Sequence, residues 1–354
     1  MNPSSPSRAE VAGLVIILLV AAFLRLHALD HAPPGLTHDE ADHGRDAARV
    51  LEGVRPIYFT VGYGREPMYD YATALVMLAV GRTYYASRLT AVFFGLLLIP
   101  LTWAWTRRAL GPATGLLAAA FIAVGFWPVM VSRQALRSVT LPPLLVAAIY
   151  WFWRCQDGHV WEAFSRQGAG KTVAAGLLLG ATFYTYLAAR VTWLIFPALL
   201  VYLALFRRDL FQRGWRRMAL ALLIAAAVSA PLFGWLLAHP GAESRIGDLA
   251  GPLEAARAGD FAPLLGHFGE ALGMFTAQGD PLWMYNLPGR PLLAPLQGVL
   301  FVVGVLMALA GTLRRQVAPA FLLIWLAAGV VPNAITGAAA ATRAVGLMPA
   351  LFVL

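Results

Sequence analysis

The sequence predicts an all-α protein that crosses a membrane several times. Of its 354 residues, 59% are apolar and only 13% are charged, whereas soluble domains carry about 25% charged residues. The apolar residues form long blocks, and a helix needs about 20 such residues to span a bilayer. The single cysteine, Cys155, excludes a disulfide within the chain and a metal centre built from several thiolates. We expect one transmembrane domain over residues 1–354.

The apolar blocks predict nine or ten spans. The first, residues 11–29, lacks a small-residue cleavage site and is therefore expected to remain as a signal anchor. A last block begins near Ala344 and stops at Leu354 in the middle of an apolar run, so we expect the C-terminus to be truncated. The blocks between them are residues 86–106, 113–131, 140–154, 172–188, 191–206, 218–237, 292–312 and 318–336.

Basic residues in the short loops predict the orientation. Arg107, Arg108, Arg314 and Arg315 fall on one side of the membrane, together with the basic loop after Arg154. The positive-inside rule assigns this side to the cytoplasm. The other side receives two long hydrophilic segments, and long loops are translocated largely regardless of their charge.

The two outer segments are residues 30–85 and 239–291, and the first is expected to be catalytic. Within it, residues 41–53 place Ala41, Ala48 and Leu51 on one side and charged residues on the other, which predicts a short helix lying at the membrane surface. Residues 68–80 are apolar but short for a span, which predicts a second interfacial or re-entrant helix.

An acidic pair opens the first outer segment, in the motif LTHDEADHGRDAARVLEG. Asp39 and Glu40 could be only the N-terminal cap of a helix, together with Thr37. However, charged residues at the mouth of a membrane helix are functional by default, and this chain has few acids. His38 and His43 lack the spacing of two zinc ligands on one helix face.

Five arginines lie at predicted outer helix ends, against the positive-inside bias. Any one of them could simply snorkel or bind a lipid headgroup. Converging guanidinium groups would instead make an anion site, and phosphate is the anion that suits them best. These residues are Arg133, Arg137, Arg190, Arg290 and Arg343.

Other motifs add candidates and exclude one activity. Arg65–Glu66 precedes a proline in GYGREPMYDY, either as a surface turn before a helix or as a second charged cluster facing the first. We include Tyr186 and Asn286, which lie in the motifs of Arg190 and Arg290, among the candidate substrate-binding residues. The string SRQGAGKT lacks the first glycine of a P-loop and follows no predicted strand, which excludes nucleotide binding there.

These motifs resemble the GT-C superfamily of membrane glycosyltransferases, nearest to the protein O-mannosyltransferase and lipid A aminoarabinose transferase type (glycosyltransferase family 39-like). The resemblance covers about residues 11–350. It implies a GT-C type transmembrane helix bundle with interfacial helices in the first outer loop. The stretches that match are LTHDEADHGRDAARVLEG, GYGREPMYDYATALVMLAVGRTYYASRL, SRQALRSVTLPPLL and NLPGRP.

The resemblance also implies substrates and roles. A polyprenyl-phosphate-linked sugar would be the donor, and a lipid, glycan or protein on the outer face would be the acceptor. Asp39 would be the base or the acceptor-orienting carboxylate, with Glu40 as its partner. Arg65 and Glu66 would contact the donor phosphate and the acceptor, and Arg190 and Arg343 would bind phosphate by their position alone.

A divalent cation, Mg²⁺ or Mn²⁺, could bind Asp39 and Glu40. The sequence departs from the family here, because Met-Tyr-Asp replaces the His-Pro-Pro-like run found after the corresponding proline in many relatives. Metal dependence therefore stays open at this stage.

The expected mechanism places the charge at the membrane surface. Outer arginines would neutralise the leaving phosphate, and Asp39 would take the acceptor's proton. A single carboxylate base with a lipid phosphate as leaving group favours inversion. Residues 68–80 and the helix ends would form a groove for the polyprenyl tail.

The alternative is a multi-spanning lipid or sugar transporter or flippase. Such proteins place charged residues within helices near the midplane, whereas these blocks are nearly free of acids. A scaffold that binds a partner through its outer loops would not need an acid beside an arginine cluster. We therefore expect a multi-pass glycosyltransferase in a bacterial plasma (inner) membrane, with its active site on the non-cytoplasmic face and no nucleic-acid partner. The identity of the sugar and of the acceptor stays open.

Overall fold

The computed structural model describes residues 5–154, 166–243, 251–336 and 340–354. Within these ranges the regular secondary structure is helical, apart from one isolated β-bridge between Phe59 and Arg65. The all-α prediction is therefore confirmed.

Among the described residues, six helices are long and apolar enough to cross a membrane, judged by length and composition. Shorter apolar helices accompany them: α5 (Pro112–Val124), α7 (Leu141–Arg154) and α8 (Arg166–Thr182), with 13, 14 and 17 residues. The predicted number of nine or ten spans stays a prediction. The six long helices are α1 (Arg8–Leu26), α4 (Tyr84–Leu110), the continuous pair α9 (Ala189–Thr192) and α10 (Ile195–Phe206), α11 (Arg208–Ala238), α15 (Pro295–Leu313) and α16 (Val317–Ile335).

The remaining elements are short. The predicted block 113–131 is divided at Gly125, whose extended backbone ends α5 and begins α6 (Phe126–Val131). The second long segment contains α13 (Gly251–Arg257) and α14 (Ala262–Gly273). Two single turns of 3₁₀-helix, η1 (Arg137–Thr140) and η3 (Val345–Leu347), and the terminal α17 (Met348–Val353) complete the chain.

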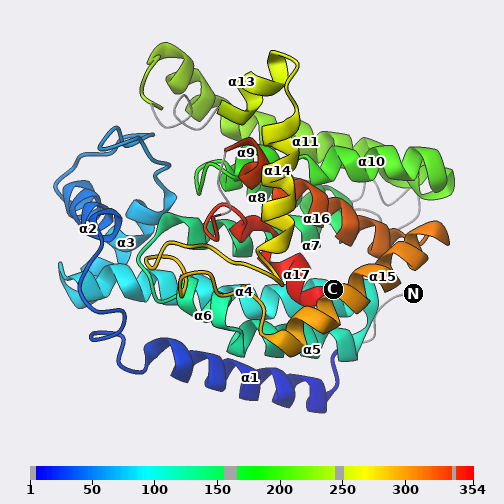
Figure 1. The fold of residues 1–354 in the computed structure, drawn as a ribbon, viewed down its shortest axis with the longest axis horizontal. Coiled ribbons are helices and arrows are strands. Elements are labelled where there is room, and N and C mark those ends of the chain that lie inside the picture. The colour runs from blue at the N-terminus through cyan, green and yellow to red at the C-terminus, as the bar shows by residue number, and fades with distance from the viewer. Residues whose placement is uncertain (1–4, 155–165, 244–250, 337–339) are drawn as a thin grey trace.

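Both helices predicted in the first outer segment are present. α2 (His38–Leu51) begins with a capping box in which Thr37 and Glu40 exchange side-chain to backbone hydrogen bonds. α3 (Met68–Val80) has the predicted bounds. In Figure 1 the two helices lie together at one end of the bundle, which we call the α2 end and predict to face outside.

The centre of the bundle contains a cluster of aromatic rings. Trp105 of α4 meets Trp153 of α7 edge to face at 6.1 Å, and Phe321 and Trp325 of α16 at 5.7 and 5.6 Å between ring centroids. Such edge contacts are the favoured geometry of aromatic pairs. These contacts hold together α4, α7 and α16, three helices that are distant in the sequence.

A glycine pair allows α8 and α11 to approach closely. A methyl group placed on Gly176 would lie 2.6 Å from Cβ of Ile224, and one placed on Gly180 would lie 2.5 Å from Cβ of Val228. These two glycines form a G-x-x-x-G pattern, which is typical of close helix contacts in membranes.

We expect Gly180→Ala to destabilise the protein by about 1–3 kcal/mol, because the added methyl overlaps the side chain of Val228. Thermal unfolding in detergent would show the effect as a lower melting temperature. Gly234→Ala in α11 is the matched control, because no atom lies within 4 Å of its added methyl. Equal melting temperatures for the two variants would contradict the close packing.

Candidate functional site at the α2 end

A chain of alternating charges crosses the α2 end. Glu66 is 1% exposed and accepts a hydrogen bond of 3.0 Å from Nε of Arg137, while Nη2 of Arg190 lies 3.7 Å from its other oxygen. Arg190 also donates two hydrogen bonds to the carboxylate of Glu243. Each guanidinium group is therefore paired, as buried charges must be.

Arg137 faces Asp39 as well as Glu66. Burial alone would lower the pKa of Arg137, but the charges of Glu66 and Asp39 and the neighbouring tyrosine Tyr186 hold it above its ordinary value. The ring of Tyr186 lies 5.5 Å from the guanidinium carbon. Arg137 therefore stays a cation at any physiological pH.

Asp39 is half-buried, and no hydrogen bond or ion pair with another described residue engages its carboxylate. It lines a cavity of about 30 Å³, which we call the Asp39 pocket. That volume suffices for one water-sized group, such as a single hydroxyl. The pocket is lined by Asp39, His43, Leu136, Arg137, Ser138, Tyr186, Tyr285 and Thr342. Sequence reasoning brought Asp39, Arg137 and Tyr186 forward, and the structure brings these three together.

Glu40 points the other way and is 2% exposed. One of its oxygens accepts from the backbone N–H of Thr37, and the other accepts from the N–H of Ala135 at 3.0 Å. Nε of Arg88 lies 3.7 Å from this second oxygen. The cap interpretation is correct for Glu40, which anchors α2 to the segment before η1.

Arg65 also turns away from the Asp39 pocket. Its Nη2 donates to Asp42 at 2.9 Å, and its Nε lies 3.8 Å from Asp46. It is 4% exposed. Arg65 therefore holds α2 against the turn before α3. This position does not support the phosphate-binding role that we expected for Arg65.

Arg133 caps the end of the first membrane helix. Its guanidinium donates to the carbonyl oxygens of Leu24, Arg25, Ala28 and Ala32 at 2.7 to 3.2 Å. Leu24 and Arg25 lie in the last turn of α1, where carbonyls lack intrahelical partners, and a cation at a helix C-terminus is favourable. The structure thus places Arg133 in a structural role.

Two C-terminal loops close the site from the opposite side. Asn286 donates to the carbonyl oxygens of Asp280 and Arg290, and the carboxylate of Asp280 accepts from the N–H of Ala341 at 2.9 Å. Arg343 donates to the backbone and hydroxyl oxygens of Thr336. Asn286 and Arg343 therefore hold the loops in shape, and these loops present Tyr285 and Thr342 to the Asp39 pocket.

An apolar groove runs beside the site between α5, α6 and α15. It consists of two cavities of about 510 and 400 Å³ that share Gln297 as a lining residue. A third cavity of about 710 Å³ lies on the opposite face of α15 and shares Arg290 and Ala294 with the first. The tail groove expected along residues 68–80 stays a prediction: α3 packs one face on α2 and α4 and exposes Leu75 and Leu78 on the other.

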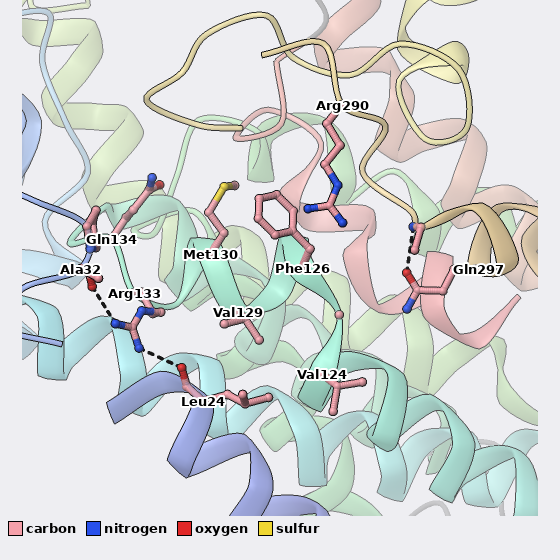
Figure 2. A pocket seen from close by; sticks show the side chains of 13 residues that line it. Leu24, Ala32, Val124, Phe126, Val129, Met130, Arg133, Gln134, Arg290 and Gln297 are labelled. Atoms are coloured by element: carbon pink, nitrogen blue, oxygen red, sulfur yellow. Dashed lines mark hydrogen bonds between the residues drawn. The ribbon is translucent and has the colours of Figure 1, made fainter. Parts of the chain in front are cut away.

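Arg290 stands at the polar mouth of this groove. Its guanidinium carbon lies 4.1 Å from the ring centroid of Phe126, and no carboxylate among the described residues pairs with it. Figure 2 shows Arg290 above Phe126 on one side of the cavity and Arg133 on the other, bonded to Leu24 and Ala32. The groove therefore combines apolar walls with the guanidinium of Arg290, which pairs with no described carboxylate.

The groove and the Asp39 pocket lie on two sides of the same backbone segments. Residues 133 and 134 line the groove, whereas 136 to 138 line the pocket. Likewise, Arg290 lines the groove and Tyr285 lines the pocket. The groove and the Asp39 pocket are therefore neighbours that share these two backbone segments.

The described residues do not form an evident divalent-cation site. No group of three or more His, Cys, Asp or Glu side chains gathers with metal-binding geometry in these parts of the chain. Of the predicted pair, Glu40 uses both oxygens on backbone N–H groups, and Asp39 already faces the cation of Arg137. These donors do not fit the predicted Mg²⁺ or Mn²⁺.

One pair escaped the sequence analysis. His43 and Asp70 meet at 2.6 Å between Nδ1 and Oδ1, with both side chains buried. The spacing of Asp39 and His43, four residues apart on a helix, was a signal that the two share a face. Glu243, by contrast, lies in a segment with no motif.

One family model matches a part of the chain. Residues 64–235 match the family model described as dolichyl-phosphate-mannose-protein mannosyltransferase. No curated protein sequence matches the chain.

Solved structures show the fold. The chain resembles ArnT from Cupriavidus metallidurans bound to undecaprenyl phosphate, with 19% identity and a TM-score of 0.63 over 98% of this chain. It resembles AglB from Archaeoglobus fulgidus in complex with an inhibitory peptide and a dolichol-phosphate, with 17% identity and a TM-score of 0.65 over 98%. The S. cerevisiae Pmt1-Pmt2 complex bound to the sugar donor matches 68% of the chain and 35% of its own, with 18% identity and a TM-score of 0.53.

The chain therefore has the membrane fold of these solved structures, and the predicted fold class is confirmed. It spans 59% of the ArnT chain and 50% of the AglB chain.

We expect Glu66→Ala to cost about 3–5 kcal/mol of stability, because it leaves Arg137 and Arg190 facing each other without the buried carboxylate. Glu52→Ala is the control, since the exposed pair of Glu52 and Arg82 should contribute no more than about 1 kcal/mol. Melting curves in detergent compare them. Similar melting temperatures would show that the charge chain is not held together through Glu66.

Proposed function

We propose that the protein is a membrane glycosyltransferase that moves a sugar from a polyprenyl-phosphate donor to a lipid, glycan or protein acceptor on the outer face of a bacterial plasma membrane. The observation that supports this most is Asp39, an unpaired carboxylate that faces Arg137 in a hydroxyl-sized pocket. The fold supports it too, because the related ArnT and AglB structures hold undecaprenyl phosphate and dolichol-phosphate.

The donor would lie with its tail in the apolar groove and its phosphate near Arg290. A guanidinium group matches the geometry of phosphate oxygens, and its charge would stabilise the leaving phosphate as the glycosidic bond breaks. Phe126 and the apolar walls exclude water on one side, which strengthens this interaction. We assign no step to a divalent cation, because arginines occupy the positions where the counter-charge is needed.

The acceptor hydroxyl would enter the Asp39 pocket. Asp39 would accept its proton while the oxygen attacks the anomeric carbon from the face opposite the phosphate, which inverts that centre. Arg137 would face the Asp39 carboxylate in the pocket, and Glu66 would hold Arg137 in place. In this proposal Glu40 supports the position of Asp39 by tethering the first turn of α2.

We expect Asp39→Asn to abolish sugar transfer, with a loss of at least about 10²-fold, because the amide cannot take a proton. Membranes that contain the wild type or the variant would be supplied with radiolabelled polyprenyl-phosphate sugars. The matched control is Asp30→Asn, since Asp30 is exposed and pairs only with His31 in an adjacent turn. Equal activity of Asp39→Asn and the wild type would exclude Asp39 as the base. Labelled lipid that crosses the membrane without sugar transfer would instead support a transporter.

We expect Arg290→Gln to raise the KM for the donor by at least about 10-fold, because loss of a charge-assisted hydrogen bond costs about 1.5–3 kcal/mol. Steady-state kinetics at varied donor concentration measure the effect. Arg257→Gln, which removes an exposed arginine of α13, is the control. An unchanged KM in Arg290→Gln would place the donor phosphate elsewhere, with Arg137 as the next candidate.

A further inference from the structure

A buried histidine–aspartate pair joins α2 to α3. Nδ1 of His43 lies 2.6 Å from Oδ1 of Asp70, and the two side chains are 1% and 0% exposed. Since an ionised carboxylate only accepts hydrogen bonds, Nδ1 must carry the proton. This fixes the tautomer of the neutral ring and leaves its lone pair on Nε2.

The free ring nitrogen faces the Asp39 pocket. His43 lines that pocket, and no described residue forms a hydrogen bond with Nε2. Asp39 lies one helical turn earlier on the same face of α2, so the two side chains are neighbours. A single water-sized group in the pocket could touch both of them.

Packing alone does not account for the pair. α2 is already held on α3 by an apolar cluster that includes Ala47, Val50, Ala74 and Met77. A buried charged pair seldom stabilises a protein more than apolar residues of the same size. The second oxygen, Oδ2 of Asp70, has no hydrogen-bond partner among the described residues.

Several ionisable groups surround His43. Asp46 lies on its own helix, and burial together with the charge of Asp70 raises the pKa of the Asp46 carboxyl. Arg65 contacts Asp46 from the turn before α3. From the other elements, Tyr69 meets the His43 ring edge on at 5.0 Å, and Asp39 and Arg137 share the pocket with it.

We propose that His43, oriented by Asp70, is the proton acceptor that completes the transfer reaction. This inference depends on the proposed function. As the acceptor oxygen bonds to the anomeric carbon, the bond from that carbon to the phosphate oxygen breaks, and its electron pair leaves with the lipid phosphate. The acceptor's proton passes to Asp39 and then to Nε2 of His43. The imidazolium, stabilised by the Asp70 carboxylate, later releases the proton to water.

The chemistry of the two groups explains the direction of this transfer. An imidazole ordinarily binds a proton about 2 pH units more tightly than a carboxylate. Asp70 is a positioning residue in this account, and its carboxylate stabilises the imidazolium that forms on His43.

The test compares His43→Gln and Asp70→Asn with His38→Gln, which replaces an exposed histidine at the start of the same helix. Purified, folded variants are assayed for kcat, for KM and for the dependence of kcat on pH. We expect His43→Gln to lower kcat by about 10²-fold with little change in KM, and His38→Gln to behave as the wild type.

The pH profile separates catalysis from packing. In the wild type, kcat should fall as the pH drops through the pKa of the pair, because the base becomes protonated. Asp70→Asn removes the charge that stabilises the imidazolium, so this fall should move to lower pH while the plateau of kcat decreases. A residue with only a packing role would change the melting temperature and leave the profile of the folded enzyme unchanged.

Asp70→Asn keeps the size of the side chain, so it remains informative if His43→Gln does not fold. An active wild type and an inactive Asp39→Asn, with kcat of His43→Gln within threefold of the wild type and an unmoved profile in Asp70→Asn, would overturn this inference and leave the proposed function intact. A wild type that transfers no sugar from any polyprenyl-phosphate donor would overturn both.

Discussion

Buried guanidinium groups must each meet an oxygen, and this constraint shapes the α2 end. Arg25 is fully buried and donates to the carbonyls of Ile122 and Ala123 at the end of α5. Arg88 donates to the carbonyl of Leu29 beyond the end of α1. Because a guanidinium cannot be deprotonated in a protein, each such group forces a loop or a helix end to turn its oxygens inward. The helix ends are thereby tied together by direct hydrogen bonds.

The same constraint distinguishes charged side chains that stabilise the fold from those that are available to contact a substrate. Once Arg65 is used on Asp42, and Glu40 on two backbone N–H groups, few ionic groups at this end remain without a partner. Asp39 is a carboxylate of this kind, and Arg290 is the corresponding cation. They lie on opposite sides of the same two loops. A charged side chain that the fold does not need for its own neutralisation is the better candidate for a substrate contact.

Local features of the fold were predictable, and long-range pairs were not. The bounds of α3 follow from Pro67 and Gly81, which flank an apolar run, and the capping box of α2 follows from Thr37 and Glu40. The role of Arg133 depends on four carbonyls more than 100 residues earlier in the chain. A sequence pattern cannot reveal such a contact, because every residue carries a backbone carbonyl group and none of them stands out as the partner.

The position of the Asp39 pocket restricts which acceptors could react. Its volume of about 30 Å³ admits one hydroxyl group and little of the molecule that carries it. The rest of the acceptor would have to lie outside, against the loops that carry Tyr285 and Thr342. The donor sugar would approach from the groove, on the other side of residues 132–138. The two substrates would then meet across one short segment, whose shape depends on Glu40 and Arg137. Specificity for the acceptor would therefore come from the loops around the pocket, and specificity for the lipid carrier from the groove.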